Sequence, residues 1–296
     1  MNRFTRDLMK KIGFDEIEQS FFFGCSIKYD YEETYKELLV KFNEDVWENL
    51  EYVNDGLSKL AQKHNDNVYT LTAIFILDSC EYALPKFLAQ GNSEELFYKT
   101  MSDIKIKLDE CKQCYGIFGV SSPLAWFAGF YEPSRYWLGR LQFEVTKFKY
   151  GNYEKEGVSI KKDDPVINIH IPSGEPMLME DCFKSYDLAC EHYKDMYEKQ
   201  GYLVFVCNSW LLFEKHREFL SPTSNISKFM DHFDIIDTTE EDTFGNGWRV
   251  FGSGNNADPT KLPEDSSLQR AYKKWICDGN KCGFSYGVRV HKIGDR

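Results

Sequence analysis

The middle of the chain contains two short segments in which apolar and polar residues alternate. They are Leu141–Thr146 and Val166–Ile171, and in each every second residue is apolar. A period of two is that of a strand with one buried face. The loop Pro172–Pro176 follows, and from Glu180 onward aromatic residues recur at helical spacing behind an acidic first turn. We therefore predict strand, strand, short loop and helix in this order.

The rest of the C-terminal half follows similar patterns. Tyr202–Cys207 is apolar throughout, which is typical of a central strand covered on both faces. Three further strands are predicted at Phe233–Asp237, Trp248–Phe251 and Tyr286–Val290, and a helix is predicted from Ser267, its N-cap, to Cys277.

The N-terminal half has a helical rhythm between Tyr31 and Phe130. Tyr69–Leu77 is apolar nearly all round, which favours a helix buried inside a bundle and also fits a strand. Ser93, followed by two glutamates, is typical of a helix N-terminus. The change of period predicts a helical N-terminal domain, residues 1–130, and a C-terminal domain with a mixed sheet, residues 131–296, in an α+β or α/β fold.

Composition and charge narrow the class of protein. The chain has 296 residues, of which 42% are hydrophobic, and this is enough to build packed cores. A net charge of −11 argues against binding to nucleic acid or to an anionic membrane, since both need a basic surface. An odd number of cysteines, nine, is typical of a reducing compartment, and neither a signal peptide nor a transmembrane run is evident. We therefore expect a cytoplasmic protein.

Five blocks of the C-terminal half occur in an order that is informative: Leu138–Glu144, Ile169–Pro176, Cys207–Leu212, Ser224–Ile226 with Phe229, and Leu268–Ala271. On these blocks the C-terminal half resembles the GNAT (N-acetyltransferase-like) fold, within a two-domain bacterial acyltransferase family whose N-terminal domain is helical.

The resemblance implies a co-substrate, acetyl-CoA or another acyl-CoA. Its pyrophosphate would lie on backbone amides of the loop Ser173–Met179, at the start of the predicted helix. The loop departs from the usual pattern of spaced glycines, because it has one glycine, next to the acidic Glu175, and two prolines that lack an N–H. The residues implied to bind the co-substrate are Ile171, Ser173, Gly174, Met177 and Asn208.

Two polar residues on the predicted strands are candidates for catalysis. If the strands pair antiparallel, Glu144 and His170 share one face of the sheet. Acyl transfer to an amine needs a base to take the proton of the nucleophile, and either residue would suit. The alternative is a polar face that is simply solvated or hydrogen-bonded to neighbouring structure.

The end of the central strand offers a second candidate. Cys207, Asn208 and Ser209 would lie beside His170 if the two strands are parallel neighbours, as the resemblance implies. A nucleophilic Cys207 served by His170, with Asn208 holding the oxyanion, would give a covalent acyl-enzyme. A buried cysteine is more commonly a small core residue.

No metal site is predicted. Cys111 and Cys114 form a single closely spaced pair, whereas a zinc site needs four ligands. Cys277 and Cys282 have a wider spacing and lie in the other domain.

The sequence thus predicts an N-acyltransferase that moves an acyl group from acyl-CoA to an unidentified small-molecule amine, without a nucleic acid or membrane partner. The alternative is a GNAT-fold module that has lost catalysis and binds a small ligand or a protein partner.

Overall fold

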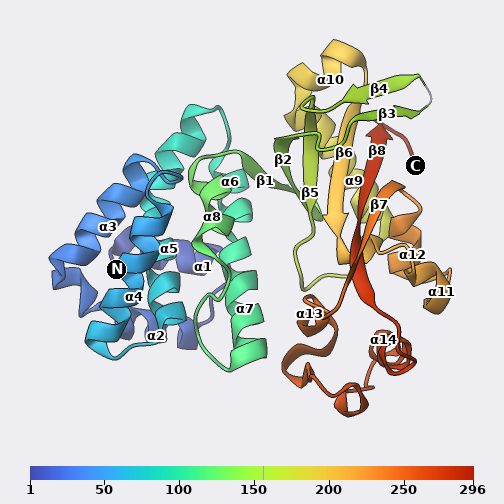
Figure 1. The fold of residues 1–296 in the computed structure, drawn as a ribbon. Helices are drawn as coiled ribbons and strands as arrows, with labels where there is room; N and C mark the ends of the chain where they lie inside the picture. Colours follow the sequence, from blue (N-terminus) through green and yellow to red (C-terminus); the bar gives the residue numbers. More distant parts are fainter. Residues whose placement is uncertain (156) are drawn as a thin grey trace. The chain divides into compact units, whose positions relative to one another are not determined.

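The computed structural model describes residues 1–155 and 157–296. The chain forms two compact units, Met1–Trp137 and Leu138–Arg296. Each unit is described by itself below, and Figure 1 labels their elements.

The first unit is a helical bundle built around one buried helix, α5 (Val68–Ala89). Asn67 caps its N-terminus, and Pro85 lies inside the helix without ending it. The buried helix predicted over Tyr69–Leu77 is therefore confirmed, as is the N-cap at Ser93. The helices packed around α5 are α1 (Arg3–Lys11), α2 (Glu16–Ser26), α3 (Glu33–Glu44), α4 (Leu50–His64), α6 (Glu94–Met101), α7 (Asp103–Tyr115) and α8 (Leu124–Tyr131); the short η1 (Tyr29–Tyr31) precedes α3.

The second unit contains a mixed sheet, as the sequence predicts. The strand order is β1-β2-β5-β6-β8-β7. The β2–β5, β6–β8 and β8–β7 pairs are antiparallel, whereas β5 and β6 are parallel. The strands are β1 (Arg135–Leu138), which spans the boundary between the units, β2 (Leu141–Lys147), β5 (Pro165–His170), β6 (Leu203–Ser209), β7 (Asp234–Glu241) and β8 (Cys282–His291).

The two faces of this sheet are covered by different elements. On one face Phe143 and Phe205 pack together, and Phe205 contacts Tyr186 of α9 (Met179–His192). On the other face a hairpin of β3 (Asn152–Lys155) and β4 (Val158–Lys161) closes an apolar cluster. The members of this cluster are Phe148, Tyr153, Val158, Ile160, Val166, Val204, Val206, Tyr286 and Val288. The central position predicted for β6 is confirmed, because both of its faces are buried.

The remaining elements follow β5 and β6 in the chain. After α9 comes α10 (Lys194–Gln200), and beyond β6 lie η2 (Trp210–Leu212), α11 (His216–Phe219) and α12 (Asn225–Met230). Between β7 and β8 lie α13 (Gly247–Phe251), η3 (Gly252–Gly254), η4 (Pro259–Lys261) and α14 (Ser267–Cys277).

Two local predictions are wrong. Trp248–Phe251 is not a strand but part of α13, where Val250 and Phe251 enter an apolar cluster with Tyr272. A segment of four residues is too short to be assigned to helix or strand by its period. The N-cap of α14 is Ser266 rather than Ser267, and it forms a capping box with Gln269.

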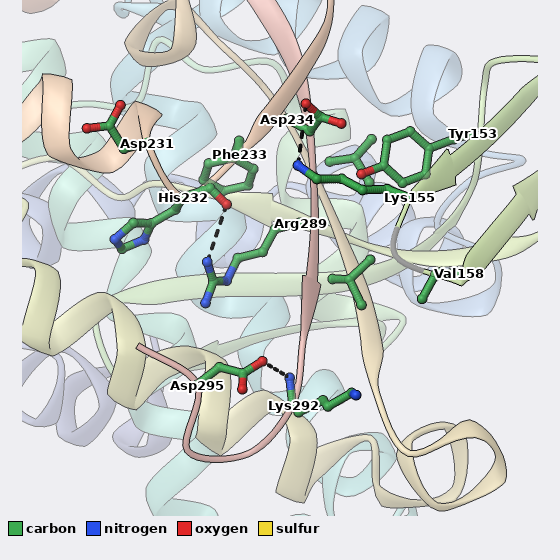
Figure 2. Close-up of a pocket in the computed structure, with 12 residues that line it drawn as sticks. Tyr153, Lys155, Val158, Asp231, His232, Phe233, Asp234, Arg289, Lys292 and Asp295 are labelled. Atoms are coloured by element: carbon green, nitrogen blue, oxygen red, sulfur yellow. Dashed lines mark hydrogen bonds and ion pairs between the residues drawn. The ribbon is translucent and has the colours of Figure 1, made fainter.

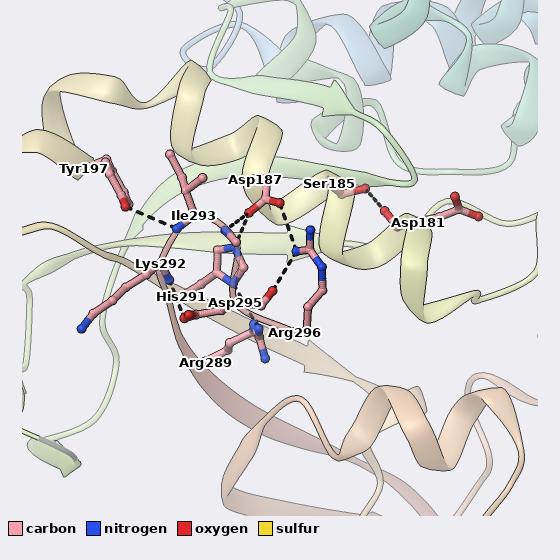
Figure 3. A network of polar contacts seen from close by, with 11 residues as sticks. Asp181, Ser185, Asp187, Tyr197, Arg289, His291, Lys292, Ile293, Asp295 and Arg296 are labelled. Carbon is pink, nitrogen blue, oxygen red and sulfur yellow. Dashed lines mark hydrogen bonds and ion pairs between the residues drawn. The ribbon is translucent and has the colours of Figure 1, made fainter.

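The end of β8 is fixed to α9 by a chain of polar contacts (Figure 3). Nη2 of Arg289 lies 3.1 Å from Nδ1 of His291, and Nε2 of His291 lies 3.0 Å from Oδ1 of Asp187. Arginine can only donate, so Nδ1 of His291 accepts and Nε2 donates to Asp187. Asp187 also accepts from the Gly294 amide and from Arg296. These contacts hold the residues after β8 against α9.

The turn before β2 lies close to α9. Gly139 has φ +69°, and a Cβ atom there would be 2.6 Å from Oγ of Ser185. That hydroxyl accepts a hydrogen bond from the Arg140 amide at 2.7 Å. It donates one to the Asp181 carbonyl (Figure 3). Only glycine combines this backbone conformation with this close approach.

We expect Gly139→Ala to destabilise the protein more than Gly201→Ala. Gly201 also has positive φ, but nothing lies within 4 Å of a Cβ there, so alanine costs only backbone strain of about 1 kcal/mol. Gly139→Ala adds a steric clash worth a further ~1–3 kcal/mol. Urea denaturation of the two variants measures the difference in the free energy of unfolding. Equal losses would contradict the close contact with Ser185.

Candidate active site on the polar face of the sheet

The antiparallel pairing of β2 and β5 brings the two predicted bases together. Gln142 lies opposite His170 and Glu144 opposite Asn168, so all four side chains share the face that carries the hairpin. Nε2 of His170 is 2.9 Å from Oε1 of Glu144 and 3.1 Å from Nδ2 of Asn168. The carboxylate and the imidazole, both mostly buried, form one hydrogen-bonded pair.

The arrangement can position a base. When the Nε2–H of His170 donates to Glu144, the carboxylate fixes the orientation and tautomer of the ring. In this tautomer Nδ1 is the ring nitrogen with the acceptor lone pair. A carboxylate that orients a histidine in this way also stabilises the imidazolium that forms when the histidine takes a proton.

The hydrogen-bonded ladder between β5 and β6 ends early. Its parallel pairs are Ile167 with Phe205 and Asn168 with Val206, although β5 continues to His170 and β6 to Ser209. The last paired residues, Asn168 and Val206, therefore lie two residues before the end of β5 and three before the end of β6.

Asn208 and Tyr286 continue the polar face across the sheet. They lie opposite each other on β6 and β8, on the same face as His170. Asn208 is exposed, whereas Oη of Tyr286 is buried and has no hydrogen-bond partner in the described chain. Burial raises the pKa of Tyr286, so the hydroxyl remains a proton donor. Sequence reasoning missed this residue because an aromatic residue in a strand is normally assigned to the core.

Cys207 and Ser209 lie on the opposite face of β6, because successive side chains of a strand alternate. Burial raises the pKa of Cys207 to about 12, so the thiol stays protonated near neutrality. Ser209 caps η2, since its Oγ accepts from the Leu211 amide at 3.2 Å. The structure therefore does not bring either residue to His170, and the geometry needed for a cysteine nucleophile served by His170 is not present.

The loop between β5 and α9 holds the other predicted binding residues. Ile171 directly follows β5, Gly174 has φ +96°, and the side chain of Met177 is buried. Oγ of Ser173 accepts a hydrogen bond from Arg249 of α13 at 3.0 Å. Leu178, at the N-cap of α9, offers no side-chain acceptor to the first-turn amides.

Arginine side chains around this loop were not among the predicted site residues. Arg140 donates to two carbonyls of the loop, those of Glu175 and Pro176, and Arg249 reaches Ser173. Arg140 lies within the block Leu138–Glu144 that carries the family resemblance. Its contacts span 35 residues or more of sequence, so no local pattern indicates them.

A separate hollow of about 390 Å³ opens beside the hairpin (Figure 2). Its lining includes Lys155, paired with Asp234 at 3.6 Å, and Arg289, which donates to the His232 carbonyl. None of the predicted site residues lines this hollow.

Two further features concern metals and membranes. Across residues 1–155 and 157–296, no group of three or more His, Cys, Asp or Glu side chains has a geometry that could hold a metal ion. Within the same residues, no helix is both long and apolar enough to span a membrane.

Comparison with family models matches both units. Residues 3–132 match the N-acyltransferase N-terminal domain, and residues 136–289 match the GNAT-like C-terminal domain. Comparison with curated proteins found no match.

Solved acyltransferase structures share the fold. One in complex with CoA and 10C-teicoplanin has a TM-score of 0.76 at 19% identity, covering 99% of this chain and 88% of that chain. Another, in complex with decanoyl-CoA and teicoplanin, has a TM-score of 0.75 at 19% identity, with 97% and 87% covered. A mutant in complex with octanoyl-CoA has a TM-score of 0.75 at 20% identity, with 97% and 88% covered. At these identities the likeness concerns the fold.

We expect Cys207 to be inert toward thiol reagents in the folded protein. With a pKa of about 12 and a buried side chain, it presents almost no thiolate at pH 8. Iodoacetamide labelling followed by peptide mass spectrometry should modify the exposed Cys277 and leave Cys207 untouched. Labelling of Cys207 at a rate comparable to that of Cys277 would contradict the expected inertness and would support Cys207 as a nucleophile.

Proposed function

Because the chain belongs to the family that joins an N-acyltransferase N-terminal domain to a GNAT-like C-terminal domain, we propose that it transfers an acyl group from an acyl-CoA thioester to an amine. The observation that carries the proposal is the His170–Glu144 pair, which lies where the β5–β6 ladder ends. The pair gives an amine nucleophile a base just beyond the paired part of β5 and β6.

The proposed reaction has a simple balance. The amine attacks the carbonyl carbon of the thioester, and a C–N bond forms while the proton of the amine passes to His170. The C–S bond then breaks, and the CoA thiolate takes up one proton. The products are an amide and free CoA.

The Glu144 carboxylate would act on this step through the histidine. It orients the imidazole and offsets the positive charge that develops on it, at an N–O distance of 2.9 Å. The Tyr286 hydroxyl lies on the same face, and a buried donor without a partner suits an oxygen that gains negative charge during the reaction.

The acyl donor would bind at the β5–α9 loop, where uncapped amides of a helix N-terminus favour a pyrophosphate. Ile171, Ser173, Gly174 and Met177 belong to this site, with Asn208 at the end of β6. Solved structures of the same fold are complexes with octanoyl-CoA and decanoyl-CoA. They support medium-chain acyl-CoA thioesters as candidate donors, in addition to the acetyl-CoA that the family resemblance implies.

A second candidate function is a module that binds a small ligand or a protein partner without catalysis. The composition of the loop favours it, because the exposed Glu175 repels a pyrophosphate and two prolines lack an N–H.

We further propose a cytoplasmic setting and a small-molecule acceptor, with no nucleic acid or membrane partner. Nine free cysteines support a reducing compartment, and the net charge of −11 disfavours polyanionic partners.

We expect His170→Gln to lower kcat about 10²- to 10⁴-fold, the usual contribution of a general base, while the Kd for the acyl donor changes less than twofold. Wild-type protein is first titrated calorimetrically with acetyl-, octanoyl- and decanoyl-CoA. Release of CoA thiol is then followed with a panel of amines. His192→Gln is the matched control, since His192 ends α9 and lies outside the polar face.

The outcomes separate the two functions. Binding of a thioester without thiol release for any amine would favour the binding module. Absence of heat with every thioester would exclude an acyl-CoA enzyme, and full turnover by His170→Gln would exclude His170 as the base.

A further inference from the structure

A buried arginine lies beneath the β5–α9 loop. Arg140 is 5% exposed, and its guanidinium donates from Nη2 to the Glu175 carbonyl at 2.7 Å and from Nε to the Pro176 carbonyl at 3.2 Å. Its own amide is held by Ser185 of α9. One side chain thus binds two successive peptide groups of the loop and is itself anchored to the helix that the loop enters.

The charge of Arg140 is not neutralised by an ion pair. Both hydrogen-bond acceptors of the guanidinium are backbone carbonyls, and its Nη1 is buried without a hydrogen-bond partner in the described part of the chain. Burial lowers the pKa of the Arg140 guanidinium, but arginine stays protonated in proteins. A buried cation with a spare donor is costly unless an anion approaches it.

The two contacts also decide which way the loop amides point. The peptide bonds of this loop, like all those in the described residues, are trans, and in a trans peptide the C=O and the following N–H point in opposite directions. The Pro176 carbonyl faces Arg140, so the N–H of Met177 faces away from it. The peptide before it ends at Pro176, which has no N–H to orient.

The start of α9 adds donors to the same segment. This helix has 14 residues, and Leu178 at its N-cap gives the first-turn amides no side-chain acceptor. The Met177 amide, the helix N-terminus and the buried cation contribute positive potential to a loop that has a single glycine. The carboxylates of Glu175, Glu180 and Asp181 oppose it.

On the basis of the proposed function, we infer that Arg140 is a positioning residue for the acyl donor. It holds the β5–α9 loop so that the Met177 amide and the first-turn amides of α9 face outward, and its charge lies behind them to favour the pyrophosphate of CoA. The loop thereby binds the anion despite Glu175, whose carbonyl Arg140 holds and whose exposed carboxylate opposes the ligand. In this loop the rigid Pro172 and Pro176, together with Arg140, would fix the backbone conformation that spaced glycines permit in the usual loop.

The test compares two acyl donors that differ in the pyrophosphate. Octanoyl-CoA carries it, whereas octanoyl-pantetheine presents the same thioester without it. We expect Arg140→Gln to weaken binding of octanoyl-CoA about 10- to 100-fold and to change the KM for octanoyl-pantetheine less than threefold. Arg140→Lys, which keeps the charge but not the two-carbonyl contact, should fall between wild type and Arg140→Gln.

Arg270→Gln is the matched control. Arg270 also donates to two successive carbonyls, those of Glu264 and Asp265, but near the start of α14 and far along the chain from the loop. It should leave the affinity for both donors unchanged.

Glu175→Gln tests the same idea without disturbing the buried arginine. It removes the opposing charge from an exposed position, so it should strengthen octanoyl-CoA binding two- to fivefold and leave octanoyl-pantetheine unaffected. This variant decides the matter if Arg140→Gln does not fold.

Three results would overturn the inference: equal affinity of Arg140→Gln and wild type for octanoyl-CoA, an equal loss for both donors, or no effect of Glu175→Gln on CoA binding. These differ from failure of the proposed function, in which wild-type protein itself binds no thioester.

Discussion

The register between β2 and β5 is the constraint on which the candidate site depends. Side chains alternate along a strand, so a slip of β2 by one residue would move Glu144 to the α9 face while His170 stayed on the hairpin face, and it would place Phe143 among polar groups. Burial of Phe143 against Phe205 makes such a slip costly. Apolar packing on one face thus determines that the carboxylate and the imidazole meet on the other, and the chemistry of the site is a consequence of the hydrophobic core behind it.

Much of this arrangement can be predicted from sequence, because period and pairing are local. The alternation at Leu141–Thr146 and Val166–Ile171 gives both strands and, with antiparallel pairing, the meeting of Glu144 with His170. The uniform apolar run of Tyr69–Leu77 gives the buried helix of the first unit. The family resemblance supplied the parallel neighbour that local pattern alone does not.

The rest depends on contacts between distant residues. The hairpin of β3 and β4 consists of two four-residue strands with charged residues on their outer face, too short to give a strand signal. Cys207 and His170 lie near the ends of neighbouring parallel strands. Their side chains are on opposite faces of the sheet, because side chains alternate along each strand. Arg140 contacts carbonyls more than 30 positions later in the chain, and the hydroxyl of Tyr286 is distinguished by having no hydrogen-bond partner among the described residues.

The edge strand β7 has a consequence for the behaviour of the protein at high concentration. A free strand edge is a template on which another copy can add a strand, and this is a common start of aggregation. β7 carries Asp234, Asp237, Glu240 and Glu241 within eight residues. Two such edges that approach each other bring like charges together over their whole length, in a chain that is already strongly anionic. Like charges on two such edges therefore disfavour the pairing of β7 with the same strand of another copy.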